Sequence, residues 1–114
     1  MINPKILCRK HLLGEHGEIH KHRHNFVKKH NMAKRVELGQ IEVETMKLRH
    51  DALAEEMLRR GYNHQSPYEM PDISYLPLEI IKKRVDLKVA LCDLITRCPD
   101  CKERYLNKGE MKWL

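Results

Sequence analysis

The residues best suited to chemistry lie near the amino terminus, between His11 and His20. This stretch carries two carboxylates, Glu15 and Glu18, together with three histidines, and sixteen residues without an acidic side chain follow it. A carboxylate beside a cationic surface can act as a general acid or base, or can stabilise a developing positive charge. The pattern therefore indicates acid–base chemistry on a polyanion. The alternative is a solvated helix face with ordinary ion pairs.

The cationic segment that follows runs from His20 to Arg35 and contains six lysines or arginines and four histidines. Such a run is suited to contacts with phosphates, whose binding energy comes largely from counterion release. The whole chain carries a formal charge of +6 and has an isoelectric point near 9.2. These charges favour a polyanionic partner. A basic face that binds nothing in particular would have the same composition.

The four cysteines raise the question of a metal. Cys98 and Cys101 are separated by two residues, but no second cysteine pair of this kind is present. Cys92, His11 or another histidine would have to complete a zinc site. A redox dithiol fits less well, because no strand–helix pattern of the thioredoxin type surrounds the pair. We therefore expect structural thiols and neither a metal nor a cofactor.

The elements that must position these residues are helical. Of the 114 residues, 41% are hydrophobic and 33% are charged, which is typical of a globular chain with a modest core. Apolar residues recur with the helical period, and strand signals are scarce. We predict an all-α fold, namely a compact single-domain bundle over residues 1–114 with three main helices and long connecting loops.

The first helix is expected to begin at Asn3, a good N-cap that is followed by proline. Gly14 and Gly17 lie inside this helix, and interior glycines often mark the close approach of another backbone or a ligand. They could equally be two tolerated weak positions. The apolar residues at seven-residue spacing predict the buried stripe of this helix: Leu12, Ile19 and Phe26.

Two further helices are expected. The second runs from about Val43 to Arg60, with Gly61 as its stop, and the third from Pro77 to about Thr96. The connections are residues 31–42 and a long loop, residues 62–76, whose length suggests a function. The expected apolar face of the second helix is Met46, Leu53, Ala54 and Met57, and that of the third is Leu78, Ile81, Val85, Cys92 and Ile95.

The location of the protein follows from two absences in the sequence. No apolar run approaches the roughly 20 residues that are needed to span a bilayer. The first five residues, Met1 to Lys5, show no secretory pattern. We therefore expect a cytoplasmic protein with reduced cysteines and no membrane partner.

Four segments resemble a known family. His11-Leu-Leu-Gly-Glu-His-Gly-Glu18 is similar to the helix-one motif of the phage and viral pyrimidine-dimer DNA glycosylases, the small ultraviolet-repair enzymes historically called endonuclease V. Leu53-Ala-Glu-Glu-Met-Leu-Arg-Arg-Gly-Tyr-Asn63 resembles the end of the family's second helix. Asp72-Ile-Ser74 and Arg84-Val-Asp-Leu-Lys88 also have counterparts, in the same order. The family is all-helical and single-domain.

The resemblance implies a DNA glycosylase with abasic-site lyase activity. In the family, the amino-terminal α-amine attacks C1′ of the damaged nucleotide, and the resulting imine undergoes β-elimination, which nicks the strand. An α-amine suits this task because its pKa of about 7.7–8.0 leaves a neutral fraction at physiological pH. By position the assisting carboxylate is Glu18, and Glu15 is expected to be structural. The nucleophile is expected to be the amine of Met1, because the bulky Ile2 disfavours removal of the methionine.

The resemblance also implies the partner. The substrate is damaged double-stranded DNA, with pyrimidine dimers as the expected lesion, and the enzyme acts as a monomer without metal or cofactor. The damaged site becomes accessible when the duplex is kinked and a base is flipped out. A phage-encoded enzyme would work in the host cytoplasm. The residues that correspond to family DNA contacts are Lys10, His11, Lys21, Arg84 and Lys88.

Departures from the family pattern leave two other functions open. Ile2 and Gly17 stand at family threonine and arginine positions, and the segment between Asn3 and His11 is about three residues shorter than in the family. A non-catalytic, basic DNA-binding protein on the same scaffold would fit the shortened amino terminus. A small zinc-stabilised regulator built around Cys98 and Cys101 is the third reading.

Overall fold

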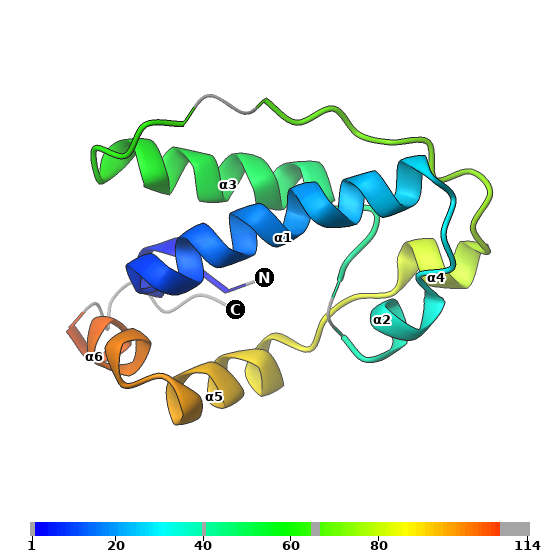
Figure 1. The fold of residues 1–114 in the computed structure, drawn as a ribbon. Helices are drawn as coiled ribbons and strands as arrows, with labels where there is room; N and C mark the ends of the chain where they lie inside the picture. Colours follow the sequence, from blue (N-terminus) through cyan, green and yellow to red (C-terminus); the bar gives the residue numbers. More distant parts are fainter. Residues whose placement is uncertain (1, 40, 65–66, 108–114) are drawn as a thin grey trace.

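The computed structural model describes residues 2–39, 41–64 and 67–107 (Figure 1). Over these ranges the chain forms no strand, which confirms the all-α prediction. None of the helices described there is long and apolar enough to cross a membrane. The elements are a 3-10 turn, η1 (Pro4–Ile6), and six helices: α1 (Arg9–Val27), α2 (Ala33–Glu37), α3 (Met46–Arg59), α4 (Leu78–Lys82), α5 (Leu87–Arg97) and α6 (Pro99–Asn107).

The centre of the molecule is the pair α1 and α3, which lie side by side (Figure 1). The predicted stripe of α1 is confirmed, since Leu12 and Phe26 are fully buried and Ile19 is 7% exposed. Burial of these large apolar side chains supplies most of the driving force for folding. The predicted apolar face of α3 is also confirmed: Met46, Leu53, Ala54 and Met57 are all buried.

The start of the first helix differs from the prediction. The Asn3 side chain accepts a hydrogen bond from the Lys5 amide at 3.0 Å, and so caps η1 and not α1. The backbone is extended at Leu7 and Cys8, and α1 begins at Arg9. The guanidinium of Arg60 accounts for this break, because it donates to the Leu7 carbonyl at 2.7 Å.

The single helix predicted from Pro77 to Thr96 is wrong. The backbone is extended from Lys83 to Asp86, which separates α4 from α5. Asp86 is the N-cap of α5, and its carboxylate accepts hydrogen bonds from the amides of Lys88 and Val89 at 3.0 and 3.1 Å. The apolar stripe predicted for this helix is therefore also wrong. Leu78 and Cys92 are exposed, and Ile81, Val85 and Ile95 are only half-buried. The residues that α4 and α5 bury are Ile80, Leu91 and Leu94.

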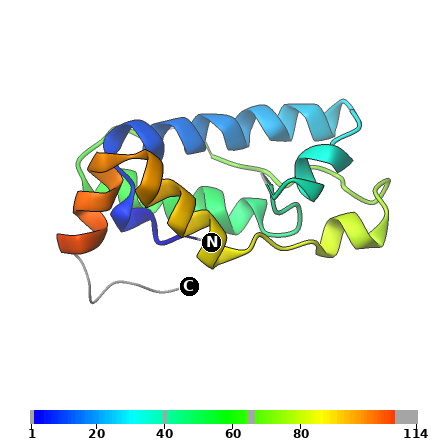
Figure 2. The same cartoon turned by 90° about the horizontal axis from the view of Figure 1, so that it is seen from below.

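The segment that follows the cysteine pair differs from the prediction as well. Cys98 ends α5 with an extended backbone, and Pro99 then begins another helix, α6. Residues 99–107 are therefore helical, although no helix was predicted after Thr96. Seen from below, α5 lies under the first half of α1, and α6 packs beside η1 at the same end of the molecule (Figure 2).

The predicted connections are largely confirmed. Gly61 ends α3 with a positive φ of 84°, a conformation that glycine adopts without strain. The loop from residue 62 to residue 76 contains no helix in its described part, and Tyr68 inserts into the core from it. The connection from residue 31 to residue 42 does contain one short helix, α2, that was not predicted.

Candidate active site

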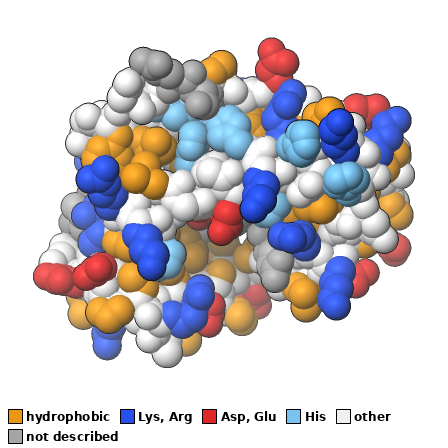
Figure 3. All heavy atoms as spheres, in the orientation of Figure 1, with side chains coloured by type: hydrophobic (Ala, Val, Ile, Leu, Met, Phe, Trp, Pro, Cys, Tyr) orange, Lys and Arg blue, Asp and Glu red, His pale blue; other side chains and the backbone are white. Residues whose placement is uncertain are grey.

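A cavity of about 1190 Å³ brings together residues that are distant in the sequence. One wall is the exposed face of α1, and the opposite wall is α5 with the extended segment from Lys83 to Asp86. Figure 3 shows the hollow open to solvent, with basic and acidic side chains around it. The predicted site residues that line this cavity are Lys10, His11, Glu18 and Arg84, and Ile2 lines it as well.

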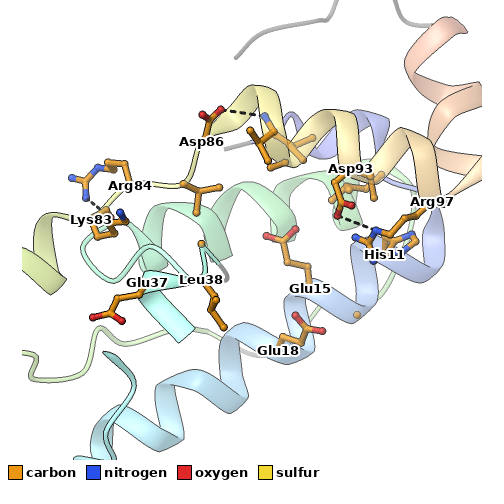
Figure 4. Close-up of a pocket in the computed structure, with 18 of the residues that line it drawn as sticks. His11, Glu15, Glu18, Glu37, Leu38, Lys83, Arg84, Asp86, Asp93 and Arg97 are labelled. Carbon is orange, nitrogen blue, oxygen red and sulfur yellow. Dashed lines mark hydrogen bonds and ion pairs between the residues drawn. The ribbon is translucent and has the colours of Figure 1, made fainter. Parts of the chain in front are cut away.

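Glu18 occupies a central place on the α1 wall. It lines this cavity and two adjoining hollows of about 300 and 210 Å³. Its carboxylate is solvent-exposed and, in residues 2–39, 41–64 and 67–107, makes no hydrogen bond or ion pair. In Figure 4 it reaches from α1 into the space that α5 faces. A carboxylate in this setting is available to a substrate.

Glu15 has a different environment one helical turn away. Arg49 of α3 binds it with two hydrogen bonds, from Nε to Oε2 at 2.5 Å and from Nη2 to Oε1 at 2.9 Å. The Arg49 side chain is only 7% exposed, so this pair is poorly screened by solvent. The same guanidinium donates to the Ile2 carbonyl. Glu15 therefore serves as a structural anchor, as expected.

Three arginines hold the amino-terminal segment in place. Besides Arg49 at the Ile2 carbonyl, Arg60 donates to the Pro4 carbonyl at 3.2 Å and to the Leu7 carbonyl at 2.7 Å. Arg104 of α6 donates to the Lys5 carbonyl at 2.9 Å. Met1, the predicted nucleophile, lies outside the described residues. Ile2, the residue after Met1, is thus fixed at the edge of the cavity that Glu18 lines.

The predicted DNA contacts are distributed around the site. Lys10 is exposed on the first turn of α1, and Lys21 shares the hollow of about 300 Å³ with Glu18. Arg84 pairs with Glu44 at 2.5 Å on the opposite wall. Lys88 is exposed on α5 but does not line these hollows. The structure therefore brings Lys10, Lys21 and Arg84 near Glu18 and leaves Lys88 further along α5.

The Nδ1 atom of His11 faces two cysteine thiols. That nitrogen lies 3.1 Å from the Cys8 sulfur and 3.5 Å from the Cys101 sulfur. The sequence analysis did not single out Cys8. The signal that was available is its two-residue separation from His11, which repeats the separation of Cys98 and Cys101.

A second group that the sequence analysis missed is a histidine cluster between α1, α3 and the following loop. Its members are His16, His20, His50 and His64, and the His16 Nε2 atom lies 3.2 Å from that of His50 and 2.9 Å from that of His64. Pale-blue side chains gather on this face in Figure 3. Burial, and then repulsion by the other three histidines, lower the pKa of His16 to about 4. A neutral imidazole is therefore the stable form of His16 at neutral pH.

One of three comparisons with known proteins finds a match. The family model described as pyrimidine dimer DNA glycosylase matches residues 1–70 of the 114-residue chain. The matched segment contains α1, α3 and the arginines that hold Ile2, Pro4 and Leu7. No curated protein and no solved structure shows a significant match. Since the family model matches more than half of the chain, this protein belongs to the pyrimidine dimer DNA glycosylase family.

Proposed function

We propose that this chain excises damaged bases from duplex DNA and then nicks the strand, with the amine of residue 1 as nucleophile and Glu18 as the assisting carboxylate. Family membership supports the substrate class and the glycosylase and lyase activities. The single observation that favours Glu18 is its exposed carboxylate, which shares one cavity with Ile2 and has no partner within the described part of the chain.

The proposed reaction needs no group beyond the chain itself. The neutral amine forms a bond to C1′ while the glycosidic bond breaks, and the base leaves with a proton. Opening of the sugar ring gives an imine between the amine nitrogen and C1′. Loss of a proton from C2′ then expels the 3′-phosphate and nicks the strand. Glu18 stabilises the cationic sugar and transfers the protons.

The surface charges are suited to holding the duplex over the cavity. Lys10, Lys21 and Arg84 lie on different sides of Glu18, which would place phosphates around the reacting sugar and not on one side of it. DNA contacts by His11 and Lys88 remain predictions, as does action as a monomer. Pyrimidine dimers are the proposed lesion.

Borohydride trapping tests the proposal. On duplex DNA that carries a pyrimidine dimer or an abasic site, we expect a covalent protein–DNA adduct and strand nicking. The substitution Glu18→Gln keeps the size of the side chain and removes its charge. It should reduce the rates of adduct formation and of strand nicking by about a hundredfold or more. The matched control is Glu55→Gln, which removes one exposed carboxylate from α3 away from the cavity and should leave both unchanged.

The site of the adduct identifies the nucleophile. After proteolysis, mass spectrometry should locate the trapped sugar on the amino-terminal residue. An adduct on a lysine would refute the α-amine mechanism even if the enzyme is active. Binding that weakens steeply with salt, without nicking of any lesion, would instead identify a non-catalytic DNA-binding protein.

A further inference from the structure

Two pairs of residues that are almost ninety positions apart converge at one end of the molecule. Cys8 is the N-cap of α1, and His11 lies in the first turn of that helix. Cys98 joins α5 to α6, and Cys101 lies in the first turn of α6. One sulfur or nitrogen atom from each of the four residues lies within 4.8 Å of the others. From this convergence we propose that the four side chains bind one zinc ion.

The spacing of the donor atoms matches a tetrahedral zinc site. Zn–S bonds of about 2.3 Å and Zn–N bonds of about 2.0 Å place two sulfurs about 3.8 Å apart, and a sulfur and a nitrogen about 3.5 Å apart. The Cys8 and Cys98 sulfurs are 3.9 Å apart. The His11 Nδ1 atom lies 3.1 and 3.5 Å from the sulfurs of Cys8 and Cys101. Three cysteines and one histidine are a common ligand set of structural zinc.

The surroundings of the sulfurs suit thiolate ligands. The Cys8 amide donates to the Cys101 sulfur at 3.2 Å, and the Cys101 amide donates to the Cys98 sulfur at 3.4 Å. Both amides belong to helix N-termini, whose dipoles favour negative charge. The three cysteines are buried and none forms a disulfide. Water therefore has little access to the ligands, which is typical of a structural site.

The proposed ion would be structural because the chain supplies four ligands and leaves no position for water or substrate. It would tie the start of α1 to the junction of α5 and α6. Those helices form the opposite walls of the cavity, as Figure 4 shows for Glu18 on α1 and for Asp93 and Arg97 on α5. Zinc would thus fix the width of the cavity. Cys98 and Cys101 lie outside the segment that the family model matches.

Metal content of the full-length reduced protein tests the site. We expect one zinc per chain by elemental analysis, and loss of that zinc in Cys101→Ser and in Cys8→Ser. Cys92→Ser is the matched control, because Cys92 is exposed on α5 and is not one of the four converging residues. Zinc content that is unchanged in the Cys8 and Cys101 variants would overturn the proposal, whether the metal sits on the histidine cluster or elsewhere.

Cobalt provides a second test that does not depend on the folding of variants. Cobalt(II) added to the wild-type protein after removal of zinc should give the intense visible bands of a tetrahedral ion and a sulfur-to-metal charge-transfer band, and one equivalent of zinc should displace it. Absence of the charge-transfer band would overturn the proposal. Neither test measures DNA cleavage. A result that refutes the zinc site therefore leaves the proposed glycosylase activity untouched, and the reverse also holds.

Discussion

At the scale of single residues, Glu15 and Glu18 show how one helix supplies two different carboxylates. The sequence assigns them different roles only through a family resemblance, because both lie on α1 within one helical turn of each other. The structure separates them physically: Arg49 neutralises Glu15, whereas Glu18 is exposed at the cavity. Arg49 comes from α3, 34 residues away from Glu15, and no local pattern in the sequence indicates this pair.

Arg49 offers a test of how precisely the amino terminus must be held. Lysine keeps the positive charge of arginine but cannot bind Glu15 through two nitrogens while it also donates to the Ile2 carbonyl. We therefore expect Arg49→Lys to slow single-turnover trapping by about a hundredfold, since small misplacements of a reacting group cost rate. DNA affinity, measured by fluorescence anisotropy, should change little. Equal losses of affinity and trapping rate would contradict a positioning role.

At the scale of elements, the sequence predicted α1 and α3 well because their apolar residues recur over several turns. It failed from residue 77 onward for an identifiable reason. Asp86 is a helix N-cap in the structure, but the sequence reading took it as one turn of a continuous helix. The predicted stripe thus ran across a break. Long-range features such as the Arg60 hydrogen bonds to Pro4 and Leu7 were out of reach, since they depend on how η1 packs against α3.

Gly17 tests the meaning of the interior glycines of α1. A Cβ atom at Gly14 or at Gly17 would meet no atom of the chain within 4 Å, so neither glycine is required for close packing within the protein. Alanine is about 1 kcal/mol better than glycine inside a helix. Gly17→Ala should therefore raise the Tm by about 4 °C, as measured by circular dichroism. An unchanged or lower Tm would show that this turn of α1 is constrained by something other than helix propensity.

At the scale of the whole molecule, a cluster of partly buried histidines links α1, α3 and the loop after α3. Burial and neighbouring positive groups lower the pKa values of His16, His20 and His22 below the ordinary value. The cluster formed by His16, His20, His50 and His64 also faces Arg23 and Tyr68. His16 and His20 are four residues apart and share a helix face, but nothing in the sequence indicated that His50 and His64 would join them.

This cluster predicts a loss of stability in mild acid. The unfolded chain takes up protons on these histidines near pH 6.5, whereas folded His16 does so only near pH 4, so the stabilising contribution is complete above pH 6.5 and declines as the pH falls toward 4. We expect the Tm to fall by on the order of 5 °C between pH 7 and pH 5. His16→Gln removes the group with the most depressed value and should flatten this dependence, while the control His24→Gln, at an exposed position of the same helix, should not. If all three proteins lose the same Tm over this range, acid sensitivity arises elsewhere in the molecule, and the neutral histidine cluster does not govern it.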